Sequence, residues 1–184
     1  MEKKGNEPRD PMPIKTLLVV FSYHHNNTEK IAKVFARVLD APIKTPQDMN
    51  PKELQEYDLV GFGSGIDSGK HYRPLLDLAD KLPHAKNKKA FIFSTCGAPA
   101  SVFKEEGLKT QTLKNHSLLR QKLQDKGYLI IDEFGCAGFN TNSFLKFFGG
   151  INKGRPNAKD LANAEEFARN IKEKAMRLTP TRFL

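Results

Sequence analysis

The chain has 184 residues and a mass of 20.7 kDa, a length that fits one domain with a sizeable hydrophobic core. Its 30 Lys and Arg residues outnumber its 21 Asp and Glu residues, so the formal net charge is +9. The sequence shows neither an apolar run of membrane-spanning length nor a signal peptide before its first apolar segment, and we therefore expect a cytoplasmic protein without membrane contact.

Residues 1–13 carry equal numbers of basic and acidic side chains, and we expect them to form a flexible tail. A domain over residues 14–178 and a short C-terminal tail, 179–184, should follow. Because the first tail is balanced in charge, the positive excess lies in the folded part. Such a surface could favour an acidic protein partner or nucleic acid, although we prefer the interpretation of a scattered, solvated surface.

The segment from Thr16 to Ala32 is the most informative part of the chain. Its unbroken apolar run, 17–21, predicts a central parallel strand that is covered on both faces. Apolar residues then recur with helical spacing from Ile31 to Val38, with Thr28 as the expected N-cap. The turn at 22–27 brings hydroxyl, amide and imidazole groups to the start of that helix. This geometry suits a phosphate, but an ordinary capped connection between strand and helix is equally open.

Strands and helices alternate through the rest of the chain. Further strands are expected at 42–44, 58–63, 89–94 and 128–134, and further helices around 75–82, 118–123 and 161–175. This alternation predicts the α/β class with a doubly wound parallel sheet. In such sheets the ligand lies beyond the carboxyl ends of the strands. Three loops rich in polar or small residues leave those ends, at 22–27, 64–71 and 94–101.

The sequence lacks the signature residues of most phosphate-binding folds. No Walker loop occurs, and the first strand is followed by His24 and His25 rather than by the glycines of a dinucleotide fingerprint. A glycine-rich series does occur, but it lies within and after the third expected strand. A receiver domain would need an Asp where Gly63 and Ser64 stand. A flavin mononucleotide (FMN) site remains, which doubly wound sheets place at the switch point of strand order.

The segment from Tyr23 to Thr28, followed by Ala32, resembles the phosphate loop of flavodoxins, and the similarity covers about residues 15–176. That loop usually reads S/T-x-T-G-N-T, and here Asn27 and Thr28 match it directly. Tyr23 and His25 replace hydroxyl residues, and Asn26 replaces glycine. Asn tolerates a left-handed backbone, so Asn26 can keep the turn. The resemblance implies a three-layer α/β/α sandwich, a five-stranded parallel sheet in the order 2-1-3-4-5, and FMN as the cofactor.

The same resemblance implies that three loops hold the cofactor. The residues expected on the phosphate side are Ser22, His24, His25, Asn26, Asn27 and Thr28, and those expected beside the flavin ring are Ser64, Gly65, Ile66, His71, Tyr72, Ser94, Thr95, Cys96, Gly97 and Ala98. Because the chain has no Trp, one of Ile66, His71 and Tyr72 would have to stack on the ring. We expect neither a catalytic residue nor a metal ligand, since flavin carries the redox chemistry itself.

Two further features leave alternatives open. Cys96 and Cys136 follow neighbouring strands, and they form either a redox-sensitive pair near the flavin or, as we prefer, two small buried thiols. The connection 138–157 is long and contains four phenylalanines, which argue against disorder. It could cover the edge of the core, as we prefer, or form a lid or a docking surface.

We therefore expect a flavodoxin-like electron carrier that transfers electrons between soluble redox proteins, acidic ones included. One alternative is an FMN-dependent NAD(P)H:quinone-type oxidoreductase, which would oxidise NAD(P)H directly. The other is a regulatory or nucleic-acid-binding α/β module without flavin. No stripe of interleaved aromatic and basic residues supports nucleic acid as a partner.

Overall fold

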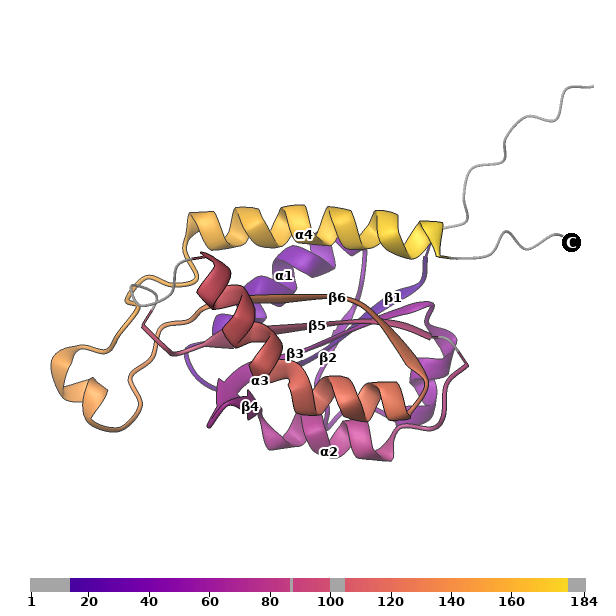
Figure 1. Ribbon diagram of the computed structural model, residues 1–184, viewed down its shortest axis with the longest axis horizontal. Helices are drawn as coiled ribbons and strands as arrows, with labels where there is room; N and C mark the ends of the chain where they lie inside the picture. The colour runs from indigo at the N-terminus through magenta and orange to yellow at the C-terminus, as the bar shows by residue number, and fades with distance from the viewer. Residues whose placement is uncertain (1–13, 87, 100–104, 179–184) are drawn as a thin grey trace, which may run out of the picture.

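The computed structural model describes residues 14–86, 88–99 and 105–178, which form a parallel sheet between two layers of helices (Figure 1). The tails expected at 1–13 and 179–184 lie outside the described residues. The elements are β1 (Thr16–Phe21), α1 (Asn27–Leu39), β2 (Ile43–Lys44), η1 (Pro51–Glu56), β3 (Leu59–Asp67), β4 (Lys70–His71), α2 (Arg73–Lys81), β5 (Lys88–Cys96), α3 (Glu105–Asp125), β6 (Tyr128–Ala137), η2 (Ser143–Phe148) and α4 (Ala158–Arg177).

The parallel strands lie in the order β2-β1-β3-β5-β6, which confirms the predicted order 2-1-3-4-5 once the short strand β4 is set aside. β1 lies inside the sheet, and residues 17–20 are buried on both of its faces. Leu17 and Val19 belong to one apolar cluster, whereas Leu18 and Val20 belong to the other. The apolar run without alternation is therefore explained by two buried faces.

Helices α1 and α4 cover one face of the sheet, and α2 and α3 cover the other (Figure 1). On the first face, Phe35 of α1 packs edge-on against Phe91 and Phe93 of β5, with ring centroids 5.6 and 5.0 Å apart. Aromatic pairs at this distance add to the stability that burial gives. Among the described residues no helix is both long and apolar enough to cross a membrane.

Three local features differ from the sequence prediction. α1 begins at Asn27 after Asn26, so Thr28 lies inside the helix and the prediction of Thr28 as N-cap is wrong. β3 continues past Gly63 and turns back as β4, with Ser68 and Gly69 at φ values of 50° and 77°. α3 begins at Glu105, well before the apolar residues at 118–123 that predict it. The sequence prediction missed the first turns of α3 because they are polar and show no apolar spacing.

The edge strand β6 contains a bulge. Ala90 pairs with Ile130, but the next residue of β5, Phe91, pairs with Asp132. Ile131 is therefore an extra residue in the ladder, as in a β-bulge. From Asp132 onward, β6 stays in regular parallel register with β5 to the carboxyl end of both strands.

Candidate functional site

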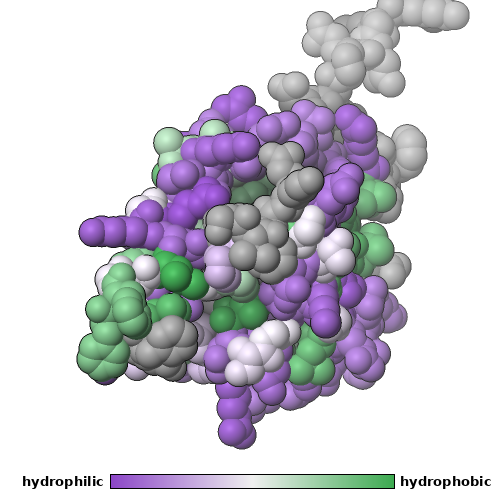
Figure 2. Space-filling view, turned by 60° about the vertical axis from the view of Figure 1, so that its left-hand side comes forward, coloured by the Kyte–Doolittle hydropathy of each residue, from purple (hydrophilic) through white to green (hydrophobic). Residues whose placement is uncertain are grey.

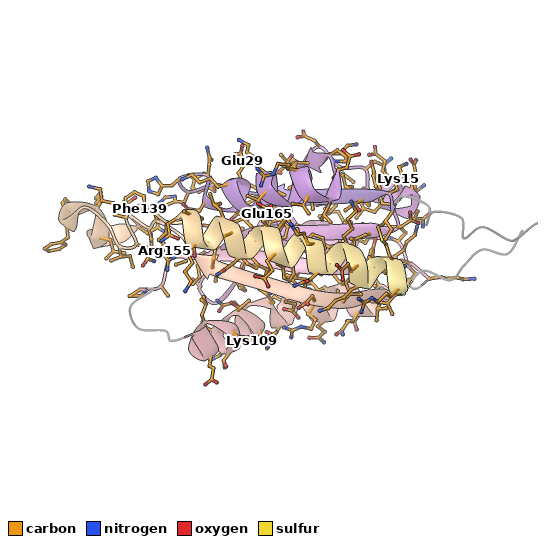
Figure 3. All side chains as sticks on the ribbon, turned by 90° about the horizontal axis from the view of Figure 1, so that it is seen from above. Lys15, Glu29, Lys109, Phe139, Arg155 and Glu165 are labelled. Atoms are coloured by element: carbon orange, nitrogen blue, oxygen red, sulfur yellow. The ribbon has the colours of Figure 1, made fainter. Side chains whose placement is uncertain are left out.

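A cleft opens at the carboxyl ends of β1, β3 and β5, where the sequence predicts the ligand. Its lining residues come from the loop after β1, the β3–β4 hairpin, the end of β5 and the connection after β6: Ser22, Tyr23, His24, Asn27, Thr28, Gly65, Ile66, Tyr72, Thr95, Gly97, Gly138, Phe139, Asn140 and Asn142. In Figure 3, Phe139 and Arg155 lie at this end of the molecule and Lys15 lies at the opposite end. The three predicted loops therefore converge on one place.

The turn into α1 exposes backbone amides to this cleft. His25 and Asn26 adopt left-handed conformations, with φ values of 53° and 52°, as expected for Asn26 in the position of a glycine. The Asn27 N–H donates to His24 O at 3.4 Å, and the Glu29 N–H donates to Ser22 Oγ at 3.2 Å. The amides of His25, Asn26 and Thr28 find no acceptor among the described residues. Open amides at a helix N-terminus form a site for an anion.

Two polar side chains form the floor of the cleft below this turn. Asn27 is buried, and its Nδ2 donates to Phe139 O at 2.8 Å, whereas its Oδ1 finds no partner in the described part of the chain. Thr28 Oγ1 and Thr95 Oγ1 share a hydrogen bond of 2.8 Å that joins α1 to β5. A buried acceptor without a donor is uncommon in folded proteins. The floor is therefore suited to a ligand that brings a hydroxyl or N–H donor.

The β3–β4 hairpin forms one wall of the cleft, and Tyr72 is its aromatic surface. The Tyr72 ring lies edge-on to Phe21 and Tyr23, with centroids 5.6 and 6.4 Å apart. A Cβ atom on Gly65 would come within 2.7 Å of Tyr72 Cε2, so a larger residue at position 65 would displace the ring. Tyr23, in contrast, is 72% exposed at the mouth of the cleft. Of the three candidates for stacking, Tyr72 and Ile66 line the cleft and His71 does not.

The connection after β6 forms the opposite wall and is tied to the other loops by hydrogen bonds. His25 Nε2 and Thr141 Oγ1 are 2.8 Å apart, and the His25 ring lies 4.5 Å from the ring of Phe139. Asn152 Nδ2 donates to Ala98 O at 2.8 Å. These contacts position the segment beside the cleft. The segment therefore lines the cleft as well as packing against the edge of the core, which was the interpretation preferred from the sequence.

The same connection projects from the carboxyl end of the sheet as η2 (Figure 1). Phe147 and Phe148 of η2 are 77% and 81% exposed. In the view toward this end, green hydrophobic atoms gather at the left-hand side of a largely purple surface (Figure 2). Exposed aromatic side chains next to a cleft are typical of a contact surface.

Seven predicted site residues lie outside the lining of the cleft. Ser64, His71 and Ser94 are buried behind it, with exposed fractions of 0%, 1% and 1%. Cys96 and Ala98 instead line a separate cavity of about 220 Å³ between α3 and the start of α4. His25 and Asn26 shape the turn at the rim through their backbones. Whether any of these residues contacts a cofactor stays a prediction.

Cys96 and Cys136 are both free, and they point to opposite faces of the sheet. Cys136 pairs with Thr95 in the ladder and lies in the apolar cluster below α1 and α4. Cys96 follows Thr95 and therefore faces α3, where Asn115 Nδ2 lies 4.0 Å from its Sγ. Burial raises the pKa of the Cys136 thiol, so it stays protonated. This arrangement favours the interpretation of two separate thiols over a redox-sensitive pair.

Behind the hairpin wall lies a buried polar network whose members on α3 and β6 sequence reasoning missed. His116 of α3 is fully buried, and its Nδ1 donates to Glu133 Oε2 at 2.8 Å. His116 Nε2 lies 2.8 Å from Ser94 Oγ. Glu133 also accepts from Arg120 Nε and, at 2.9 Å, from Arg120 Nη2. The His71 ring packs against the His116 ring with centroids 4.8 Å apart and planes tilted by 38°. Sequence spacing gave no signal for this group, because strands and α3 bring its members together from distant positions.

Burial and pairing shift the pKa values of this network in different directions. Burial lowers the pKa of His71 well below the usual value for histidine, and the nearby His116 lowers it further. The pKa of His116 is also lowered, because burial outweighs the opposite effect of Glu133. Burial would raise the pKa of Glu133, but hydrogen bonds from His116 and Arg120 reverse this and lower it. At neutral pH the network therefore contains two neutral imidazoles beside a carboxylate–guanidinium pair.

Comparison with known proteins agrees with this geometry. The family model for the flavodoxin domain matches residues 18–177. An uncharacterised protein of Methanocaldococcus jannaschii is 45% identical over 158 residues, which are 86% of this chain and 98% of that protein. Oxidised flavodoxin 2 from Bacillus cereus has a similar structure, with a TM-score of 0.63 at 18% identity over 87% of this chain and 99% of that one. A flavodoxin from the domain Archaea gives a TM-score of 0.59 at 15% identity, over 88% and 99%.

Proposed function

Because this chain belongs to the flavodoxin domain family, we propose that it binds FMN in the cleft at the carboxyl ends of β1, β3 and β5 and carries electrons between redox proteins. The observation that carries the proposal is the turn into α1. Three backbone amides without acceptors among the described residues meet the positive end of a helix there. A phosphate ester is the ligand group that this arrangement binds best.

The remaining parts of FMN match the rest of the cleft. The buried Oδ1 of Asn27 is an acceptor for a hydroxyl of the ribityl chain. Tyr72 offers an aromatic face on the hairpin wall, and Gly65 leaves room for its ring. The connection after β6 closes the far side through Phe139 and Asn140. These residues would hold the phosphate, orient the ring and exclude water from it.

FMN, when bound, supplies one- and two-electron redox chemistry, so the protein needs no nucleophile or general base of its own. The role of the chain is then to bind, orient and shield the cofactor. Exposed Phe147 and Phe148 beside the cleft would contact the partner protein during electron transfer.

The net charge of +9 supports acidic redox proteins as partners, because opposite charge speeds association at low ionic strength. We propose a soluble carrier in the cytoplasm, with an NAD(P)H:quinone-type oxidoreductase as the alternative. The two differ in one reaction, since the enzyme oxidises NAD(P)H without a separate reductase.

The test is a titration of the purified protein with FMN, followed by visible absorption and by quenching of flavin fluorescence. We expect one FMN per chain, with riboflavin bound more weakly because it lacks the phosphate that the open amides would hold. NAD(P)H added to the loaded protein should leave it oxidised, whereas direct bleaching would identify the oxidoreductase. Absence of FMN binding would reject both functions.

A further inference from the structure

The polar network behind the hairpin wall has the connectivity of a Ser–His–acid triad but not its access. Ser94, His116 and Glu133 are joined by hydrogen bonds of 2.8 Å. Ser94 is only 1% exposed and lines neither the cleft nor the cavity between α3 and α4. A nucleophile must reach its substrate, so the buried Ser94 cannot catalyse hydrolysis. Any role of the network must therefore pass through the residues that it contacts.

Hydrogen bonds connect the network to the wall of the cleft. The Ser64 hydroxyl donates to Gly65 O at 2.7 Å, so its oxygen is left to accept from the Tyr72 N–H at 3.1 Å and from His71 Nδ1 at 2.8 Å. Ser64 is thus a node that joins both strands of the hairpin. The position of Ser64 depends on its hydrogen bond with His71. The position of the His71 ring depends in turn on the His116 ring packed against it.

In the described part of the chain, this pattern leaves no acceptor for a second proton on the His71 ring. With its Nδ1 proton used on Ser64, His71 has a bare Nε2 that is buried and has no partner among the described residues. A proton on that atom would create a buried donor without an acceptor. His116 donates from Nδ1 to Glu133, so in the neutral ring Nε2 accepts from Ser94, and a second proton would force the Ser94 hydroxyl to turn round and accept. A charge on either ring would also lie within 4.8 Å of the other.

We propose that His71 and His116 are positioning residues which hold the β3–β4 hairpin against the cleft only while both rings are neutral, so that mild acid releases the hairpin and weakens the grip on the flavin ring. The part concerning flavin rests on the proposed function. The charged groups that face the pair are Arg120 of α3 and Glu133 of β6. β3 and β5 contribute the hydroxyls of Ser64 and Ser94, and Asp67 lies at the exposed end of the hairpin.

The first test needs no ligand. Hydrogen exchange of the apoprotein, measured as protection factors at about pH 7.5 and about pH 5.5, reports opening of the hairpin. Once released, a histidine regains its ordinary pKa, so protection of residues 64–72 should fall about tenfold for each histidine exposed. Amides of the buried strand β1 report global unfolding, and the hairpin amides should be less protected than these at both pH values. Hairpin protection that stays constant over this range would overturn the proposal.

Two variants assign the effect to the pair. His71→Asn keeps a hydrogen-bonding group near the position of Nδ1 but cannot be protonated, so the part of the fall in hairpin protection that comes from His71 should be lost in this variant. His84→Gln removes an exposed histidine and should behave like the wild type. An equal fall in His71→Asn would overturn the proposal, and if that variant does not fold, the wild-type exchange measurement still decides it.

A third measurement separates this proposal from the proposed function. The dissociation constant of riboflavin should rise about tenfold or more between the same two pH values, because riboflavin depends on the hairpin wall and lacks a phosphate. A constant value would contradict the link to the flavin. Failure of both FMN and riboflavin to bind at any pH would reject the proposed function, while hydrogen exchange would still test the histidine pair.

Discussion

Two pairs of histidines flank the same cleft in opposite environments. His24 and His25 lie in the solvent-facing turn before α1, with ring centroids 5.1 Å apart. His71 and His116 lie behind the opposite wall, almost without exposure. The first pair lies beside open amides that attract an anion, whereas a charge on His71 would be desolvated and without a partner among the described residues. Histidine therefore lies beside the proposed phosphate site on one side of the cleft, and on the other side it is buried as a neutral ring.

The largest expected effect comes from removing the charge that orients the buried pair. Glu133→Gln should lower the free energy of unfolding by about 3 kcal/mol, because His116 and Arg120 both lose their carboxylate acceptor in a buried setting. Urea denaturation at neutral pH measures it. The matched control is Glu165→Gln, which removes a partly exposed surface carboxylate paired with Arg37 and Arg169, and it should leave stability nearly unchanged. Equal losses of unfolding free energy in the two variants would show that the buried network contributes no more to stability than a surface ion pair does.

The pH dependence of stability is the next largest effect. Both buried histidines have lowered pKa values in the folded state, so in mild acid the unfolded chain binds more protons than the folded chain does. Their contribution is complete above the ordinary histidine pKa of about 6.5 and is lost as pH falls below it. From about pH 7.5 to 5.5 His71 should remove about 1.4 kcal/mol, and His116, whose pKa Glu133 partly restores, should remove less. Urea titrations of the wild type and of His84→Gln should agree, and a flat profile would contradict buried neutrality.

A smaller effect is expected at the turn on the other side of the cleft. Asn26 has a φ of 52°, a conformation that Asn tolerates better than other non-glycine residues. Asn26→Ala should cost about 1 kcal/mol of folding free energy, whereas Asn26→Gly should be nearly neutral. Thermal unfolding of the two variants measures the difference. If both lose equal stability, the side chain rather than the backbone conformation matters.

The smallest effect concerns the solvent-facing pair. Replacing His24 and His25 together by Gln should weaken FMN binding about two- to fivefold and leave riboflavin binding unchanged, because only FMN carries the phosphate that would lie beside this turn. Fluorescence titrations with both ligands measure this. Equal weakening for riboflavin would mean that the pair shapes the cleft wall, through contacts such as His25 with Phe139, rather than the charge of the anion site.

The sequence predicts the framework of this molecule better than its interior polar contacts. Runs such as 17–20 are apolar because two faces are buried, and helical spacing from Ile31 to Val38 reflects burial against the sheet, so both are visible locally. The hairpin with β4 is missed because two residues are too short for a pattern, although Ser68 and Gly69 form a turn. The contact of His71 with His116 depends on packing between distant segments, which no local spacing reports.

The bulge at Ile131 has a consequence for tolerance to changes in chain length. Because Ile131 is surplus to the ladder, deleting it would leave Glu133 opposite Ile92 and facing α3, at the expense of the packing of Ile131 itself. Losing one residue after Asp132 would instead reverse the face of the residues that follow it. Cys136 would then leave the α1–α4 side of the sheet. Single-residue deletions along β6 should therefore be tolerated at one position and disruptive at its close neighbours.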